Sequence, residues 1–443
     1  MEFVSEATPV DLLLHPEWII PIEPAGVTLA DHSLAVDQGC IVDLLPRAEA
    51  LRRFRPRETV FLPGQVLLPG LVNLHTHAAM TLLRGFADDL PLAVWLSERI
   101  WPAEARHVCP DFVYTGTLLA CAEMLRGGIT TFSDMYFFPE AAAAAIQHAG
   151  LRAALGLVIL EFPTRYASDA ADYLSKGLAM RDAWRDNPLL SFCIAPHAPY
   201  TVSDKTFEQV AMLAAQLDLP IHTHLHETRQ EIEDSLRQHG VRPLERLRRL
   251  GLLGPQLIAV HAVHLDLAEI DLLRQEGCHI AHCPISNLKL GSGIAPLTAI
   301  HGHGLNFGLG TDGAASNNRL DLFQEMRFAA LLAKGASEDA AVIDAHTVLH
   351  AATLGGARAL GLDGQIGSLR PGKAADLCAV HLDDWLLQPH FDPATHLVHV
   401  AGREQVTQAW VGGRQMLRDG TPECIGTPEL LKSVNLWHTR IAS

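Results

Sequence analysis

Residues 70–77 read GLVNLHTH, a short apolar run that ends in two histidines one residue apart. A run of this length, bounded by a glycine and ending in polar side chains, is typical of a buried strand in a parallel sheet. The rest of the chain shows whether this strand is isolated or is the first of a series.

Seven further runs of the same kind follow, at residues 128–135, 151–160, 189–198, 219–227, 257–265, 279–286 and 305–313. Segments with apolar residues at helical spacing lie between them, for example residues 111–128, 203–217 and 266–277. Eight such units over about 300 residues predict an α/β fold of the (β/α)8 TIM-barrel type. A doubly wound sheet is the competing architecture. Even spacing and polar residues at the end of nearly every run favour the barrel, because barrels gather their chemistry at the carboxyl ends of the strands.

Both ends of the chain also have strand-like patterns. Residues 27–46 and 58–70 alternate apolar and polar positions between turn signals, and the pattern returns at 375–384, 396–402 and 406–416. We expect that neither end buries a core alone and that the two ends form one domain. The predicted domains are a composite β-sandwich domain of residues 1–68 and 371–443 and a barrel of residues 69–370.

The composition excludes several classes of partner. Apolar residues make up 48% of the chain, and the formal charge is −16, so we expect no nucleic-acid partner, because phosphate backbones require Lys and Arg. Eight cysteines without a C-x-x-C pair are typical of a reduced cytoplasmic protein. Residues 1–21 are acidic where a signal peptide would be basic, and no run is long enough for a transmembrane helix. We therefore expect a cytoplasmic location and no membrane partner.

Histidine is the informative residue type, with 24 in the chain. His75 and His77 are two positions apart, so on a strand their side chains point the same way. Two imidazoles arranged in this way can bind one metal ion, since His is a common zinc ligand. Such a pair is also frequent among structural or exposed residues, so the pair alone leaves both alternatives open.

Other predicted strands also end in ionisable residues. They are His222, His224, His226 and Glu227 in the fifth run, His261 and His264 in the sixth, His279 and His282 in the seventh, and Asp312 in the eighth. Any one of these could be a hydrogen-bonded buried group or a surface residue. The whole set is harder to explain in that way, because polar side chains inside an apolar barrel are costly unless paired or bound to metal. Three N or O ligands with one open position form a catalytic metal site, where bound water becomes a nucleophile near neutral pH.

Five motifs occur in an order that a known family shares. They are PGLVNLHTHAAMTLLRGFADDLPLAVWL at 69–96, IWPAE at 100–104, HLHET at 224–228, HCPISNLKLGSGIAP at 282–296 and GTDGAASNN at 310–318. Through these motifs the chain resembles the amidohydrolase superfamily over nearly its whole length. Within it, the chain is most similar to the branch of 5′-methylthioadenosine/S-adenosylhomocysteine deaminases. Chloro-s-triazine hydrolases and guanine deaminases have similar motifs.

The resemblance implies one divalent metal ion, usually Zn²⁺. The implied ligands are His75, His77, His224 and Asp312. His224 is selected because it stands three residues before Glu227, as in the H-x-x-E motif of the family. Spacing alone does not exclude His222 or His226, because strand geometry puts both on the same face as His224. His222 lies deeper in the strand and suits a core or supporting role, and His226 suits a loop at the rim.

The resemblance also implies a mechanism, the hydrolytic deamination of an adenine ring. Asp312 is implied to take the proton of the activated water, with His261 assisting nearby. Glu227 is implied to donate a proton to N1 of the ring, so that C6 is attacked and ammonia leaves. Positioned proton transfer of this kind contributes about 10²–10⁴-fold to a rate. Taken alone, Glu227 could be an ordinary acid at a helix start.

Two further residues are implied to contact the substrate, in addition to Glu227 and Asp312. Glu104 matches the acid that binds ribose hydroxyls, and His197 matches a fourth-strand histidine of the family. From the sequence alone, Glu104 is more simply a first-turn helix acid after Pro102, and His197 a capping or loop residue.

The absence of one lysine is informative. Binuclear relatives carry a fourth-strand Lys that becomes a carbamate bridging two metals, whereas the run at 189–198 has none. Lys176 precedes that run in a helical stretch. A single metal and deamination are therefore favoured over cyclic-amide hydrolysis.

The expected substrate is a small purine nucleoside, 5′-methylthioadenosine, with S-adenosylhomocysteine or adenosine as further candidates. A homocysteine carboxylate usually requires Arg. Arg152 opens a predicted strand and is expected at the barrel bottom, so Arg165 is the better placed of the two. Its apolar neighbours Phe162 and Pro163 suit a thiomethyl group and favour methylthioadenosine.

Three other functions fit the same motifs. A guanine or other aminoheterocycle deaminase would have no use for a ribose-binding acid, and a chloro-s-triazine hydrolase would release chloride. A non-catalytic metal-binding scaffold would need no proton shuttle. Relatives in the superfamily often form dimers or tetramers, which predicts a homo-oligomer.

Overall fold

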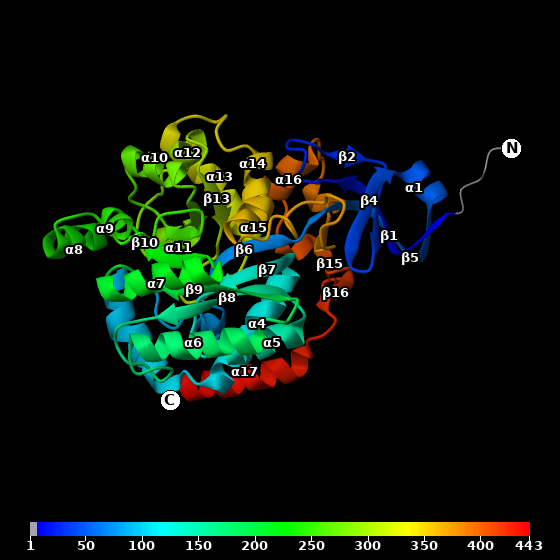
Figure 1. Cartoon of the computed structure of the whole chain (residues 1–443). Helices are drawn as coiled ribbons and strands as arrows, with labels where there is room; N and C mark the ends of the chain where they lie inside the picture. The colour runs from blue at the N-terminus through cyan, green and yellow to red at the C-terminus, as the bar shows by residue number, and fades with distance from the viewer. Residues whose placement is uncertain (1–6) are drawn as a thin grey trace.

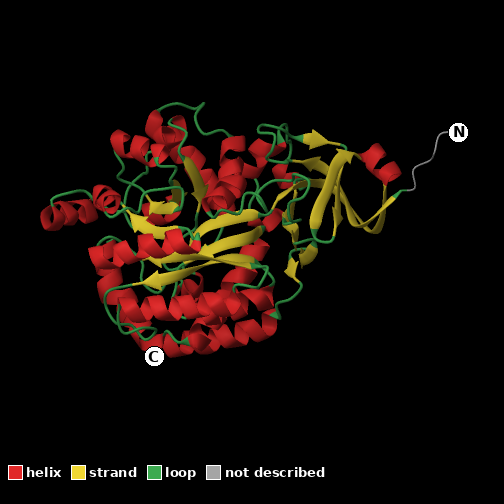
Figure 2. Cartoon of the chain, in the orientation of Figure 1, coloured by secondary structure: helices red, strands yellow, loops and turns green. Residues whose placement is uncertain are grey.

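The predicted barrel is confirmed by the computed structural model, which describes residues 7–443 (Figures 1 and 2). Eight parallel strands lie in one sheet in chain order. They are β6 (Leu71–Thr76), β7 (Ile129–Asp134), β8 (Arg152–Ile159), β9 (Leu190–Pro196), β10 (Ile221–Leu225), β11 (Leu257–His261), β12 (His279–His282) and β13 (Asn306–Leu309). Just beyond β13 the amide of Asp312 donates to the carbonyl oxygen of His75 at 2.9 Å, so the barrel nearly closes.

Continuous burial explains why these runs read as uniformly apolar. Every residue of β6, β7 and β8 is buried, as expected for parallel strands covered on both faces. The helices around them are α4 (Pro110–Arg126), α5 (Pro139–Ala149), α6 (Ala170–Trp184), α7 (Asp204–Leu217), α8 (Arg229–His239), α9 (Pro243–Arg249), α10 (Leu267–Gln275), α11 (Pro284–Lys289), α12 (Leu297–Gly302), α13 (Leu322–Ser337), α14 (Ala345–His350) and α15 (Gly356–Ala359).

Capping side chains begin several of these helices directly after the strand ends. Asp169, Ser203, Thr228 and Asp266 each accept a hydrogen bond from a first-turn amide, in α6, α7, α8 and α10. Such caps satisfy amides that have no partner inside the helix. The carboxyl ends of the strands therefore lead into short, well-defined turns, and those turns carry the candidate site.

The second domain combines both chain ends in one mixed sheet of nine strands. They are β1 (Thr8–Ile19), β2 (Leu29–Ala30), β3 (His32–Asp37), β4 (Cys40–Pro46), β5 (Phe54–Pro69), β14 (Leu377–His381), β15 (Val406–Val411), β16 (Arg414–Arg418) and β17 (Thr421–Pro422). The long strand β5 joins the two ends, since it pairs with β1 on one side and β14 on the other. The composite domain is thus confirmed. The residue boundaries at 68 and 371 stay a prediction, and the first six residues of that segment lie outside the described residues.

One predicted strand is wrong. Residues 396–402 lie mostly in a helix, α16 (Pro393–His399). Asp392 explains the difference, because its carboxylate accepts hydrogen bonds from the amides of Ala394 and Thr395 at 3.3 and 3.0 Å. With Pro393 in the first turn, this is a helix-start signal that overrides the apolar alternation that follows. Another short helix, α1 (Arg47–Arg53), separates β4 from β5.

The two domains are tied together below the barrel. Arg152, at the start of β8, donates to the Asp376 carboxylate at 2.9 Å, and both side chains are buried. The expected location of Arg152 at the barrel bottom is confirmed. At the chain end, α17 (Thr427–Ala442) runs along α4 (Figure 1), with the Trp437 ring edge-on to Phe112 at a centroid distance of 5.3 Å. Among residues 7–443, no helix combines the length and apolar character needed to cross a membrane.

Candidate metal centre and active site

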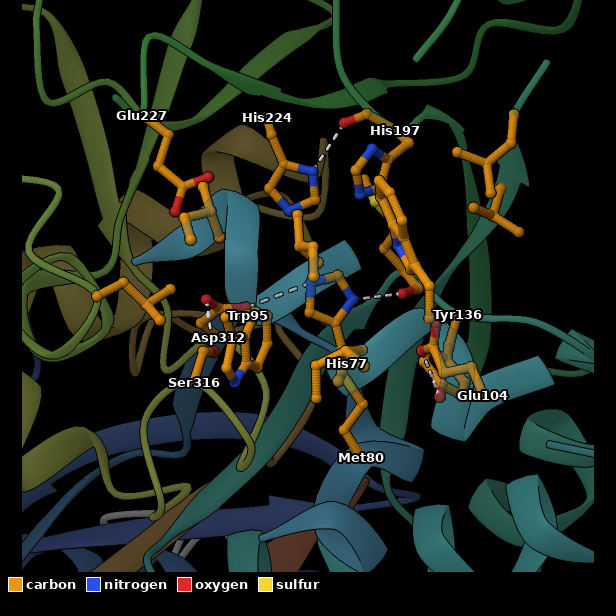
Figure 3. Close-up of a pocket in the computed structure, with 18 of the residues that line it drawn as sticks. His77, Met80, Trp95, Glu104, Tyr136, His197, His224, Glu227, Asp312 and Ser316 are labelled. Atoms are coloured by element: carbon orange, nitrogen blue, oxygen red, sulfur yellow. Dashed lines mark hydrogen bonds and ion pairs between the residues drawn. The ribbon is translucent and has the colours of Figure 1, made fainter. Parts of the chain in front are cut away.

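Four side chains converge at the carboxyl end of the barrel, and Figure 3 labels three of them, His77, His224 and Asp312. His75 lies at the end of β6, His77 just after it, His224 in β10, and Asp312 just after β13. The Nε2 atom of His75 lies 3.2 Å from Nε2 of His224 and 3.3 Å from Oδ1 of Asp312. The same Oδ1 lies 3.3 Å from Nε2 of His77. The proposed ligands therefore gather around His75, which belongs to two close groups of donor atoms, one with His77 and Asp312 and one with His224 and His261.

Hydrogen bonds on the outer side of each ring determine which nitrogen faces the centre. His77 Nδ1 donates to the carbonyl oxygen of Met135 at 2.6 Å, and His224 Nδ1 donates to that of His197 at 2.7 Å. Their Nε2 atoms then carry lone pairs, which point at the shared centre. Burial lowers the pKa of His75 to about 4, so this ring is neutral as well.

These donors fit a small divalent cation. Tetrahedral zinc with Zn–N distances of about 2.0–2.1 Å holds its ligand nitrogens about 3.3–3.4 Å apart. The 3.2 Å between His75 Nε2 and His224 Nε2 is close to that separation. Two lone pairs facing each other at this distance in a dry site repel unless a cation lies between them. Three imidazoles and one carboxylate are also a donor set that zinc prefers.

Asp312 is held as an anion by its surroundings. Its Oδ2 accepts hydrogen bonds from the hydroxyls of Ser286 and Ser316 at 2.6 and 2.7 Å, and its Oδ1 accepts from the amide of Gly313 at 2.7 Å. Burial acts to raise the pKa of Asp312, but the three hydrogen bonds that it accepts and its contact with the His75 ring favour the anion and hold that pKa well below its usual range. The residue also has a φ of 61°, a left-handed backbone that non-glycine residues adopt at functional sites at some cost in free energy.

The two additional histidines of the fifth run take different positions. His222 lies in β10 below His224, and its Nε2 is 3.1 Å from Nδ1 of His75. His226 was expected on the same face, and this expectation is wrong. The strand ends at Leu225 and His226 has a φ of 53°, which turns its ring away so that its Nε2 accepts from the amide of Leu244.

The other strand-end histidines do not join the centre. His264 bonds the carbonyl oxygen of Ser292, and His279 starts β12 at the opposite end of the barrel, beside Asn306. His282 lines a small separate cavity between α11, α12 and α13. The pattern of histidines at strand ends therefore identified more residues than the site uses.

Glu227 lies in the turn between β10 and α8 and is only 4% exposed. Its Oε2 is 3.8 Å from Nε2 of His261. Burial raises the pKa of Glu227 to about 7, with Asp312 adding to the effect and His261 opposing it. The carboxyl group therefore keeps its proton near neutral pH and can donate it to a bound ring nitrogen.

His261 ends β11 with a φ of 70°, and its ring stacks on that of His224. Its Nδ1 is 2.8 Å from Oδ1 of Asn287, which leaves Nε2 free to accept a proton on the side of the cavity. The donor atoms of His75, His224 and His261 also lie close enough together to hold an ion. Asn287 lies within the HCPISNLKL motif, but the sequence did not predict its contact with His261.

One cavity of about 720 Å³ is lined by His77, His224, Asp312, Glu227 and His261. The segment between β6 and α4 covers it with apolar side chains from α2 (Leu92–Val94), η2 (Trp95–Ile100) and α3 (Trp101–His107). Trp95, Ile100 and Trp101 line this wall. A flat, apolar ring that enters the cavity would displace water from around the donors and strengthen each electrostatic contact.

Glu104 lines the same cavity, although the sequence alone favoured an ordinary helix-start role. It lies on α3, and Tyr136, just after β7, donates from its hydroxyl to Oε1 of Glu104 at 2.8 Å. Burial raises the pKa of Glu104 to about 7. Its second oxygen stays available for a substrate hydroxyl. Tyr136 was missed in the sequence, where only its position after a predicted strand indicated a site.

His197 follows β9 and also lines the cavity. Its Nδ1 is 2.9 Å from the hydroxyl of Thr201, and its carbonyl oxygen accepts from His224. Burial lowers the pKa of His197 to about 3, with the nearby His77 and His75 adding to the effect, so this ring is neutral.

A second cavity of about 680 Å³ adjoins the first behind Glu104 and Trp101. Phe162, Pro163 and Arg165 contribute to its wall. The Arg165 guanidinium donates to the carbonyl oxygen of Arg106 at 3.1 Å and so is held at the rim.

Strand β9 carries no lysine, and Lys176 lies on α6, where it pairs with Asp172 at 2.9 Å. Among the described residues, no lysine lines the cavity that holds the donors. This arrangement matches a mononuclear centre rather than a carbamate-bridged one.

Known proteins resemble this chain along its whole length. The model of the amidohydrolase family matches residues 66–416. The curated 5-methylthioadenosine/S-adenosylhomocysteine deaminase of Teredinibacter turnerae is 45% identical over 99% of this chain and 100% of its own. The protein of the same name from Saccharophagus degradans is 44% identical over 99% of this chain and 98% of its own.

Solved structures give the same result. The crystal structure of an adenosine deaminase from Xanthomonas campestris with bound zinc has a TM-score of 0.97 at 50% identity, over 99% of this chain and 100% of that chain. An atrazine chlorohydrolase from Arthrobacter aurescens, complexed with zinc, has a TM-score of 0.88 at 23% identity, over 96% of this chain and 100% of that one. The second likeness concerns the fold alone. With full-length relatives above 40% identity and a family model that spans both domains, the chain belongs to the amidohydrolase family, beside the 5-methylthioadenosine/S-adenosylhomocysteine deaminases.

Proposed function

We propose that this protein hydrolytically deaminates the adenine ring of 5′-methylthioadenosine, giving the inosine analogue and ammonia. The observation that carries the proposal is the placement of Glu227. It is a buried carboxyl group that keeps its proton near neutral pH, in the same cavity as the converging Nε2 and Oδ1 atoms. The names of the full-length relatives support the same chemistry.

His75, His77, His224 and Asp312 would hold one divalent metal ion, and zinc suits this donor set. When bound, such an ion lowers the pKa of a coordinated water toward neutrality and supplies the nucleophile. Glu227 and His261 line the same cavity as His77, His224 and Asp312, so a substrate ring bound there would meet the proton-transfer groups and the metal ligands together.

The chain's own groups then move the protons. Glu227 donates its proton to N1 of the adenine ring, which makes C6 electrophilic. Asp312, with His261 beside it, accepts the proton of the attacking water as the C6–O bond forms. That proton passes to the exocyclic amine, the C6–N bond breaks, and ammonia leaves. The proton left on the C6 oxygen passes to the Glu227 carboxylate as the carbonyl forms, which restores the acid. The anionic state of Asp312 and the neutral state of Glu227 are the two states that this sequence of steps requires.

Substrate selectivity would come from the wall shared by the two cavities. Glu104 lies at their junction and would accept hydrogen bonds from the ribose hydroxyls, oriented by Tyr136. The 5′ substituent would then extend into the second cavity. Its apolar lining suits a thiomethyl group, and Arg165 is the cation near it that would meet a homocysteine carboxylate. We therefore propose methylthioadenosine as the better substrate and S-adenosylhomocysteine as the weaker one.

A turnover assay tests this assignment. Zinc-loaded protein would be offered methylthioadenosine, S-adenosylhomocysteine, adenosine, guanine and a chloro-s-triazine, while ammonia, chloride and the change in purine absorbance are followed together. We expect rapid ammonia release from methylthioadenosine and slower release from S-adenosylhomocysteine. Turnover of guanine or release of chloride, with inert nucleosides, would contradict the proposal and favour one of the alternatives named above.

Replacing Glu104 with Gln tests the ribose contact. With a pKa of about 7, Glu104 is mostly ionised at pH 8, and a hydrogen bond to an ionised group contributes about 1.5–3 kcal/mol. We therefore expect kcat/KM for methylthioadenosine, measured at pH 8, to fall about 10–100-fold, mostly through KM. The matched control is Glu161→Gln, on a loop outside the lining of the first cavity, where Glu161 accepts from Ser203 and Thr206. An unchanged KM in the Glu104 variant would show that the carboxylate does not bind the ribose.

The predicted homo-oligomer and cytoplasmic location stay predictions. Light scattering on the purified protein would measure the first, since a dimer or tetramer doubles or quadruples the 48.2 kDa mass of the chain.

A further inference from the structure

The layer directly beneath the converging donors is unusually polar. Barrel interiors are normally filled by branched apolar side chains. Here His222 of β10, Ser133 of β7 and Cys193 of β9 meet below His75, and the four residues are fully or almost fully buried. A polar group in such a place must have a hydrogen-bond partner, because leaving it unpaired costs free energy.

The contacts in this layer form a chain with one consistent direction. The Nε2 atom of His75 faces Asp312 and His224, so a ring that offers its lone pair there must carry its hydrogen on Nδ1. That Nδ1 is 3.1 Å from Nε2 of His222, which therefore accepts. The hydrogen of the His222 ring is then on Nδ1, 3.1 Å from the hydroxyl oxygen of Ser133 and 4.0 Å from the sulfur of Cys193.

His75 differs in this respect from the other two imidazoles at the centre. His77 and His224 donate to backbone carbonyl oxygens, which can only accept hydrogen bonds. The outer acceptor of His75 is a side chain, and that side chain has two tautomers. Ser133 completes the chain, because its hydroxyl oxygen can accept the hydrogen on Nδ1 of His222 when Nε2 of that ring accepts from His75.

We propose that His222 and Ser133 form a relay that sets the tautomer of His75 and holds its Nε2 lone pair toward the metal. His222 is thus a positioning residue that acts through His75. The inference rests on the metal centre of the proposed function, but it makes a claim about metal affinity rather than about the substrate.

A purely space-filling role for His222 leads to a different expectation. If only volume mattered, an apolar side chain of similar size would serve equally well. With Leu at this position the Nδ1–H of His75 would have no acceptor in a dry layer. The ring would relieve this by moving its hydrogen to Nε2, which removes the lone pair from the centre. Zinc affinity should therefore distinguish the two roles.

The test measures zinc affinity of the full-length protein by competition with a chromophoric chelator. Loss of groups that orient metal ligands commonly costs about 10–100-fold in metal affinity, and we expect His222→Leu to fall in this range. His222→Gln provides an acceptor oxygen near the position of Nε2, so it should recover most of the affinity. The matched control is His282→Leu, a buried strand-end histidine that lines a separate cavity, which should bind zinc as the wild type does.

Ser133→Ala is a second variant, for which we expect a smaller change in zinc affinity. It removes the acceptor of His222 and should weaken zinc binding less than His222→Leu does. Because both residues act in one chain, the double variant should match His222→Leu alone rather than add to it. If His222→Leu fails to fold, the Ser133→Ala and His222→Gln affinities decide the question.

Three outcomes would overturn the relay: wild-type affinity in His222→Leu, equal weakening in the Leu and Gln variants, or an equal loss in the His282 control. Each is independent of turnover. A failure of the substrate assignment, with zinc affinity changing as described, would leave the relay intact.

Discussion

Replacing Glu227 with Gln is expected to nearly abolish deamination while zinc content stays at the wild-type level. The amide has almost the shape of the carboxyl group but cannot transfer a proton to N1 of the ring. Positioned proton transfer contributes about 10²–10⁴-fold, so kcat should fall by that factor or more. The measurement is steady-state turnover of methylthioadenosine combined with metal analysis of the same sample.

The pH profile gives a second readout for Glu227. Its pKa is raised to about 7 by burial, and the acid form is the active one. The rate should therefore be level below that pH and fall as the pH rises through it, because Glu227 then loses its proton. In Glu227→Gln this alkaline limb should be absent from the residual activity.

Glu104→Gln is the matched control, since it removes another glutamate carboxyl group of the same cavity. It should act mainly on KM, whereas the Glu227 variant should act on kcat. Loss of zinc from Glu227→Gln would show that Glu227 is itself a metal ligand, and near-normal kcat would show that another group protonates the ring.

Periodicity in the sequence was enough to predict the barrel, because each strand is a short apolar run and helical segments alternate with the strands. It was less reliable where one local signal competed with another. At 396–402 the apolar alternation suggested a strand, but the Asp392 cap and Pro393 start a helix there. The composite domain was predictable because both ends carry strand patterns, and one buried cluster does combine the two ends, for example Leu34 with Trp410.

The sequence predicted the site residues whose side chains lie on the same face of one strand. His75 and His77 share a face, as do His222 and His224, and the structure bears this out. His226 was misplaced because the strand ends one residue earlier and a positive φ redirects its ring. Side chains alternate between the two faces only within the strand, and the sequence does not show clearly at which residue the strand ends.

Residues that act through others were the ones that sequence reasoning missed. Tyr136 positions Glu104 from 32 residues away, and Asn287 positions His261 from 26 residues away. Ser133 is 58 residues from His75 and acts on it through His222. Each lies on or just after a different strand from its partner, so only the closed barrel brings the pair together. A spacing rule describes one strand at a time and cannot identify such contacts.

Replacing Asp312 with Asn is expected to weaken zinc binding and to lower the rate together, unlike the change at Glu227. The carboxylate has no spare oxygen: Oδ1 faces the Nε2 atoms of His75 and His77, and Oδ2 accepts from Ser286 and Ser316. An asparagine can keep its oxygen toward the metal only by pointing its NH₂ group at the two serine hydroxyls, which must then reverse their hydrogen bonds.

The expected magnitudes follow from the two roles of this carboxylate. Losing a group that merely orients a ligand costs about 10–100-fold in metal affinity, so losing the charge of a direct donor should cost at least as much. Loss of the proton acceptor should lower the rate by about 10²–10⁴-fold even when zinc is supplied in excess. Chelator competition measures the first effect, and turnover at saturating zinc measures the second.

Asp321→Asn is the matched control for Asp312→Asn. Asp321 is also a buried aspartate after β13, but its Oδ1 caps α13 by accepting from the amides of Phe323 and Gln324. Asparagine caps helices about as well as aspartate does, so zinc affinity and turnover should stay near wild type. If Asp312→Asn regained full activity at saturating zinc, Asp312 would be a metal ligand only, and the proton of the attacking water would have to pass to His261.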